Sequence, residues 1–257
     1  MHKSKTSIGL VEFVALMAMM TSLTAMSIDS MLPALSEIGL DLGLQRPNDS
    51  QLVISLLLVG MAVGQMFLGP LSDSIGRKPT VYIGFGLFIT GCLMSMLTTN
   101  FQIMLAGRML QGLGAAAPRV VVVALIRDLY TGREMARVMS FVMAVFILIP
   151  VVAPAFGQAI LLVAHWRWIF GSFLIIVLFI GIWFAWRQPE TLSPDRRTPF
   201  SLATIGRAIR EAVTHRMVFG YTITIGLVFG AFIGYLNSAQ QVFQEKYDLG
   251  TLFPLYF

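Results

Sequence analysis

Charged side chains are scarce in this sequence. Only 12% of its 257 residues are Asp, Glu, Lys or Arg, whereas soluble domains carry about 25%, and the mean hydropathy is +0.78. This composition excludes a cytosolic enzyme and a disordered chain. Cysteine is scarcer still: Cys92 has no second cysteine to pair with, which excludes a scaffold held by internal disulfides.

Clusters of residues that carry chemistry are also missing. The three histidines, His2, His165 and His215, are far apart, and no His/Cys group has the spacing of a metal site. No nucleophile–base constellation and no phosphate-binding glycine loop is recognisable. We therefore predict a protein that is not an enzyme and that uses neither a metal nor another cofactor.

Long apolar runs are what the sequence has in excess. A helix needs about 20 apolar residues to cross ~30 Å of hydrocarbon, and seven stretches approach or exceed this length. They are residues 7–28, 52–71, 81–97, 101–126, 138–163, 168–186 and 217–236. Because the runs are continuous, we predict an all-α integral membrane protein with seven membrane-spanning helices.

The basic residues indicate how these helices are oriented. With the N-terminus inside, 13 of the 18 Lys and Arg residues fall in inner segments, and only Arg46, Arg167 and Lys246 fall outside. Arg108 and Arg119 lie within a span. Since inner loops are enriched in Lys and Arg, this distribution favours a cytoplasmic N-terminus. The pI near 9.7 then reflects inner loops, and we expect no nucleic-acid partner.

A long hydrophilic segment, residues 187–216, separates the sixth span from the seventh. Within it, residues 200–213 place apolar side chains at helical spacing, which predicts an amphipathic helix. Two interpretations of that helix remain open: it lies on the inner membrane face, or it is a solvated linker.

Three parts follow from this arrangement. Residues 1–187 form a six-helix transmembrane bundle, residues 188–216 form a cytoplasmic linker, and residues 217–257 hold the first helix of a second bundle. The apolar stretch at residues 249–257 resembles the entry to an eighth span. We therefore expect the sequence to be a truncated form of a longer, twelve-span protein.

The loop between the second and third spans combines glycine with charge. It reads Gly69-Pro70-Leu71-Ser72-Asp73-Ser74-Ile75-Gly76-Arg77-Lys78. Gly69 allows two helices to approach closely, Asp73 can cap a helix or pair with an arginine, and Gly76 permits a tight turn. Arg77 and Lys78 anchor the inner face. The alternative is an ordinary charged turn, but the pattern resembles the signature loop of the major facilitator superfamily, at the same topological position.

Further stretches resemble the Bcr/CflA drug-resistance subfamily of that superfamily. They are Asp29-Ser30-Met31-Leu32-Pro33-Ala34-Leu35 at the end of the first span and Arg108-Met109-Leu110-Gln111-Gly112-Leu113-Gly114 in the fourth. In the fifth span, Pro154 and Gly157 match the superfamily's antiporter motif, whereas Pro150 departs from it. Together these three residues are expected to bend the helix and to bring it close to a neighbour.

The resemblance implies both a fold and an activity. It implies a complete six-helix N-terminal bundle and proton-driven export of small amphipathic drugs by alternating access, in a bacterial inner membrane. Membrane lipids, the drug and protons would be the partners, and the full-length protein would be a monomer. A truncated non-transporting remnant, or a half-transporter that needs a partner, is the alternative. A seven-helix receptor is less favoured because receptors place the N-terminus outside.

Four ionisable residues in the spans are candidates for coupling protons to substrate: Glu12, Asp29, Arg108 and Arg119. A charge inside the bilayer costs about 2.5–3.5 kcal/mol on insertion scales, so such residues are functional candidates by default. The two arginines are 11 residues apart, about three turns, and therefore share a helix face, with Gln111 near it. We expect that face to line a watery cavity.

Depth in the membrane predicts two pairs, Asp29 with Arg108 and Glu12 with Arg119. A carboxyl group in a partly dry cavity can load and release a proton near neutral pH. Asp29 is the first candidate for this role because it also belongs to the subfamily-like stretch. Structural roles are the alternatives: Asp29 as a helix-end acid in water, Glu12 reaching the interface, and Arg108 holding a cavity pair.

Overall fold

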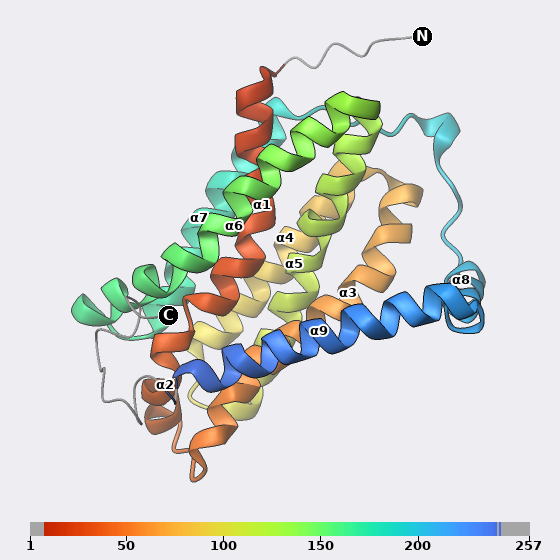
Figure 1. Cartoon of the computed structure of the whole chain (residues 1–257). Coiled ribbons are helices and arrows are strands. Elements are labelled where there is room, and N and C mark those ends of the chain that lie inside the picture. Colours follow the sequence, from red (N-terminus) through yellow and green to blue (C-terminus); the bar gives the residue numbers. More distant parts are fainter. Residues whose placement is uncertain (1–7, 241, 243–257) are drawn as a thin grey trace. The chain divides into compact units, whose positions relative to one another are not determined.

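The computed structural model describes residues 8–240 and residue 242 (Figure 1). It divides into two compact units, residues 1–198 and residues 199–257, which we describe separately. All regular structure in the described residues is helical.

The first unit contains six long helices. They are α1 (Leu10–Asp29), α3 (Leu52–Ile75), α4 (Arg77–Leu97), α5 (Phe101–Leu129), α6 (Gly132–Val163) and α7 (Arg167–Arg187). Each of them is long and apolar enough to cross a membrane, as is Arg216–Tyr235 of the second unit, which makes seven such helices in the described part of the chain. The predicted all-α membrane fold and its seven spans are confirmed.

Helix α5 lies at the centre of this bundle, against α3 and α4, while α1 packs on α6, and α4 also packs on α7. The small residues of α5 make the contact possible. A Cβ at Gly112 would collide with the backbone of Leu57 on α3, and one at Gly114 would meet the backbone of Gly84 and Phe88 on α4. Without side chains at these positions the helix backbones approach closely, as in other membrane bundles.

Short helical pieces join α1 to α3. They are η1 (Leu32–Ala34), α2 (Leu35–Asp41) and η2 (Pro47–Gln51). Asp41 at the end of α2 accepts hydrogen bonds from Arg167 Nη1 at 2.6 Å and from Trp166 Nε1 at 3.2 Å. These bonds attach the α1–α3 connection to the start of α7. Hydropathy alone does not reveal such pieces because they are too short to span a membrane.

The second unit holds α8 (Leu202–Thr214) and α9 (Arg216–Gln240). The side chain of Ser201 accepts a hydrogen bond from the backbone N–H of Thr204 and so caps the start of α8. α8 coincides with the amphipathic helix predicted at residues 200–213. Its placement at a membrane face, and the three-part division of the chain, stay predictions. The entry to an eighth span, predicted at residues 249–257, lies outside the described residues.

Candidate functional site

The signature loop is mostly helical. α3 continues through Asp73 to Ile75, and only Gly76 makes the turn into α4. Its φ of +113° is one that side chains with a Cβ rarely adopt. The tight turn expected at Gly76 is confirmed, and it places the start of α4 directly beside the end of α3.

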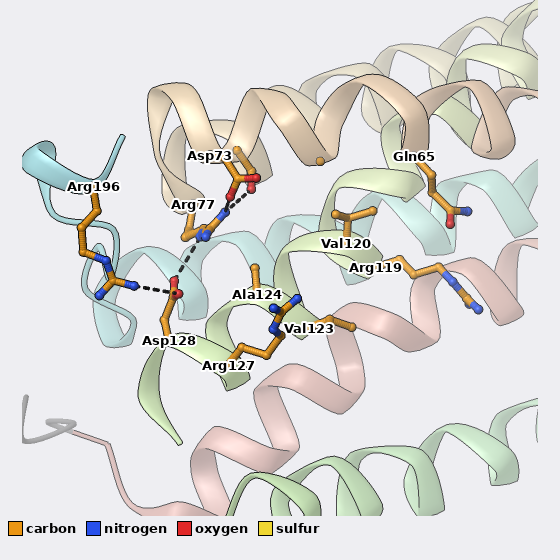
Figure 2. Close-up of a pocket in the computed structure, with 12 residues that line it drawn as sticks. Gln65, Asp73, Arg77, Arg119, Val120, Val123, Ala124, Arg127, Asp128 and Arg196 are labelled. Carbon is orange, nitrogen blue, oxygen red and sulfur yellow. Dashed lines mark hydrogen bonds and ion pairs between the residues drawn. The ribbon is translucent and has the colours of Figure 1, made fainter. Parts of the chain in front are cut away.

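Arg77 binds the acidic side chains around this turn (Figure 2). Its Nη1 donates to Asp73 Oδ1 at 2.5 Å and to Ser72 Oγ at 2.6 Å, and its Nε donates to Asp128 Oδ2 at 3.1 Å. The Asp128 carboxylate also accepts from the Thr191 hydroxyl. Of the two roles left open for Asp73, capping a helix or pairing with an arginine, the structure shows the pairing, and one guanidinium connects α3 and α4 to the end of α5.

A distant acid caps α4. No side chain of its own N-terminal residues caps this helix. Glu190, which follows α7, accepts the backbone N–H of Arg77 at 3.0 Å and that of Lys78 at 2.9 Å. The Lys78 ammonium donates to the carbonyl of Ala185 at 3.0 Å. A carboxylate is favourable at a helix N-terminus, where free N–H groups and the helix dipole meet.

Sequence reasoning missed Glu190 and Asp128 as members of this network. Their one visible signal is that each acid lies within four residues of the end of a predicted apolar span, in a chain with few acids. We name the group formed by Asp73, Arg77, Asp128 and Glu190 the signature-loop network.

A cleft of about 660 Å³ opens beside this network. It is lined by Gln65, Gly69, Ser72, Asp73, Arg77, Arg119, Val120, Val123, Ala124, Arg127, Asp128 and Arg196. Four arginines and two aspartates make the lining net positive. In Figure 2 the side chain of Arg119 points away from the ion pairs of Arg77.

The expectation that Gly69 lets two helices approach closely is wrong. A Cβ there would make only an ordinary contact, 3.6 Å from Val120 Cγ1. The close approach of α3 to α5 occurs earlier on α3, at Gly60 and Gly64, where a Cβ would collide with the backbone of α5. Gly69 lies at the level where the cleft separates the two helices, so it lines open space.

Arg108 is fully buried, with 0% of its surface exposed. Its Nε donates to the carbonyl of Val53 at 2.9 Å, and its Nη2 donates to the carbonyl of Ser27 at 2.7 Å. Its Nη1 donates to Gln111 Oε1 at 2.6 Å, and Gln111 Nε2 in turn donates to Cys92 Sγ at 3.1 Å. The expectation that Arg108 faces a watery cavity is therefore wrong: it joins α1, α3 and α5 inside the bundle.

Asp29 is 4% exposed and ends α1. No ion pair with Arg108 is present in the described part of the chain, so the pairing predicted from depth is wrong. The arginine reaches α1 at Ser27, and a residue two positions further along lies about 200° around the helix. The prediction compared only the depths of the two residues in the membrane. The rotation of α1 about its axis keeps the Asp29 carboxyl from facing Arg108.

The second predicted pair, Glu12 with Arg119, is also wrong. Both carboxylate oxygens of Glu12 accept from Arg187, and Oε1 also accepts from Trp183 Nε1 at 3.1 Å. α1 and α7 are packed together, so the end of α7 offers Glu12 a nearer cation. Arg119 instead lies over the ring of Phe146, with its Cζ 5.8 Å from the ring centroid.

Comparison with known proteins identifies the family. Residues 14–257 match the family model described as Major Facilitator Superfamily. The chain belongs to this superfamily. The signature-loop resemblance is thereby confirmed, and the described spans are the helices of a multi-pass membrane protein.

Several curated superfamily relatives are similar to the chain. An uncharacterized MFS-type transporter, YdgK, of Bacillus subtilis (strain 168) is 35% identical over 91% of this chain and 58% of its own length. A bicyclomycin resistance protein homolog of Haemophilus influenzae is 32% identical over 92% and 59%. Multidrug resistance protein MdtL of Escherichia fergusonii is 30% identical over 85% and 54%. The chain thus spans little more than half the length of these relatives.

One solved structure supports the superfamily fold. The human organic anion transporter MFSD10 (TETRAN) matches with a TM-score of 0.60 at 16% identity, over 78% of this chain and 53% of that chain. At this identity the likeness shows the shared fold alone.

The superfamily's antiporter-like residues lie in α6, which contains Pro150 and Pro154 in its interior. A Cβ at Gly157 would collide with the carbonyl of Ser30, directly after Asp29. The expected close contact at Gly157 is confirmed, and it holds α6 against the end of α1. The bending role of the two prolines stays a prediction.

Proposed function

We propose that the protein is a secondary active transporter that exports small amphipathic drugs in exchange for protons by alternating access. Membership in a superfamily of transporters, with relatives named for bicyclomycin and multidrug resistance, supports this proposal. We further propose a bacterial inner-membrane location with a cytoplasmic N-terminus, and a monomer in which lipids, protons and the drug are the partners. A transporter of this kind catalyses no covalent chemistry.

The burial of the Asp29 carboxyl is the observation that supports proton coupling. The Asp29 carboxyl is 4% exposed at the end of α1 and pairs with no cation within residues 8–240 and 242, so we propose that it is neutralised by a proton. Binding of that proton and binding of substrate can then exclude each other. If the proton enters from the acidic side when the drug leaves, inward proton flow drives outward drug flow.

Arg108, Gln111 and the signature-loop network support this mechanism by position. The Arg108 guanidinium binds the carbonyl of Ser27, in the α1 turn that precedes Asp29, and so holds the end of α1 in place against α5. The signature-loop network holds α3, α4, α5 and the segment after α7 at one end of the bundle. Separation of those helices during alternating access requires its bonds to break.

Transport of bicyclomycin into inverted membrane vesicles tests the proposal. With an imposed pH gradient, we expect uptake by the native protein and loss of at least tenfold in the Asp29→Asn variant, because an amide carries no transferable proton. Asp49→Asn is the matched control and should retain uptake, since Asp49 lies in η2 outside the long helices.

Undiminished gradient-driven uptake by Asp29→Asn would remove Asp29 from the mechanism. The alternative, a non-transporting remnant or a half-transporter, predicts a different result. In that case the purified 257-residue chain in liposomes would transport nothing, whatever the residue at position 29, until a partner is added.

A further inference from the structure

Arg119 has no acceptor within the described residues and yet is not exposed. Three other arginines of the first unit's spanning helices also have no acceptor there, but they are exposed: Arg127, Arg133 and Arg137. Arg119 lies in α5, with its side chain partly buried and its Cζ 5.8 Å from the centroid of the Phe146 ring. A guanidinium has five N–H donors and keeps its charge in proteins. The face of an aromatic ring offsets part of that charge, but it accepts no hydrogen bond from the guanidinium N–H groups that point past it.

The acids of the same cleft are already engaged. Asp73 and Asp128 both bind Arg77. At the same end of the bundle, Glu12 binds Arg187. A cation within a span is costly, so its persistence without a counter-charge points to a role outside the fold's own stability.

A second, smaller cavity also has Arg119 in its lining. Its volume is about 120 Å³. Apart from Arg119 it is lined by Thr21 of α1, Val122 and Val123 of α5, and Met139, Val142, Met143 and Phe146 of α6. Apolar cavities of about 150 Å³ accept benzene. This one is therefore of the size of a phenyl ring or a branched alkyl group.

We infer that Arg119 recognises the acidic group of a transported compound whose apolar end enters this small cavity. A carboxylate or sulfonate matches the guanidinium fork with two parallel hydrogen bonds. Methionine side chains in the lining adapt to apolar groups of different shape. The inference rests on the proposed export function and names amphipathic anions as one class of its substrates.

Binding of 3-phenylpropionate to the purified chain in neutral detergent tests this inference, with the uncharged 3-phenylpropionamide as the matched ligand. We expect the native protein to bind the anion at least tenfold more tightly than the amide. Arg119→Gln should lower anion affinity at least tenfold and leave amide affinity unchanged. Arg127→Gln is the matched control: Arg127 lines the larger cleft but not the small cavity, so the preference for the anion should persist.

Retained amide binding shows that the Arg119→Gln protein is folded. If that variant does not fold, Arg119→Lys serves instead: it keeps the charge but loses the fork, so the anion preference should fall and not vanish. Equal affinity of the native protein for the two ligands, or full anion preference in Arg119→Gln, would overturn the inference. So would loss of phenylpropionate binding on adding phosphatidylglycerol, because the site would then belong to a lipid headgroup.

This equilibrium measurement needs no pH gradient, so it is independent of proton-coupled export. Anion preference at Arg119 without vesicle uptake would sustain the site and reject the transport mechanism. Vesicle uptake together with equal binding of the anion and the amide would sustain the transport mechanism and reject the Arg119 site.

Discussion

Arg77 and Arg108 are buried in the same six-helix unit, and their charges are balanced in opposite ways. Arg77, at the junction of α3 and α4, contacts the carboxylates of Asp73 and Asp128. Arg108, inside the bundle, contacts two backbone carbonyls and the amide oxygen of Gln111. Within the described residues, the first arginine has counter-charges, whereas the second has neutral dipoles and the face of the Phe170 ring, 5.7 Å from its Cζ.

The difference follows from where water can reach. Bringing a carboxylate into a dry interior costs desolvation energy that its attraction to an arginine repays only in part. Carbonyl oxygens of membrane helices are already present and carry no net charge. The signature-loop network lies beside an open cleft and can be re-solvated when its helices move. The Arg108 contacts are fully buried and cannot be re-solvated in this way, so we regard them as a fixed connection between helices.

Arg108→Ala should therefore have the largest effect on stability. It leaves three acceptors unsatisfied and a cavity in the bundle, and we expect a loss of about 2–4 kcal/mol. Thermal unfolding in detergent measures the change. Gln102→Ala, an exposed residue on the same helix, is the control and should change little. A melting temperature for Arg108→Ala equal to that of the control would mean that Arg108 is not a fixed connection.

Glu190→Ala should have an intermediate effect. Removing the cap from α4 leaves the N–H groups of Arg77 and Lys78 to solvent, at about 1–2 kcal/mol. The difference in stability between the native protein and Glu190→Ala should shrink at high ionic strength, because salt screens the electrostatic part of the cap. Asp195→Ala, an exposed acid in η3 (Pro194–Arg196), serves as the comparison. If both variants melt alike, Glu190 does not cap α4 in solution.

Arg187→Ala should have the smallest effect. Its ion pair with Glu12 is partly exposed at the end of the bundle, and such pairs often contribute nothing measurable. A double-mutant cycle with Glu12→Gln in thermal unfolding should give a coupling within experimental error. A large coupling would show that this pair is shielded from water, and would weaken the contrast between the bundle's end and its interior.

The sequence predicted the fold better than it predicted the pairings. Apolar length located all seven spans. An arginine partner was one of two roles foreseen for Asp73, and Arg77, four residues further along the same segment, supplies it. The partners of Glu12 and Arg108 could not be predicted in this way. Each helix touches several others, and the depth of a residue in the membrane does not say toward which of them its side chain points.

Seven membrane helices, their approximate limits and the turn at Gly76 were determined by the sequence itself, since hydropathy and backbone freedom are properties of single residues and short runs. Only the tertiary structure decided which charges meet. Glu190 reaches α4 across more than a hundred residues, and Arg108 lies inside the bundle instead of facing a cavity. Such contacts depend on how each helix is rotated against its neighbours, and that rotation is set by the packing of the bundle as a whole.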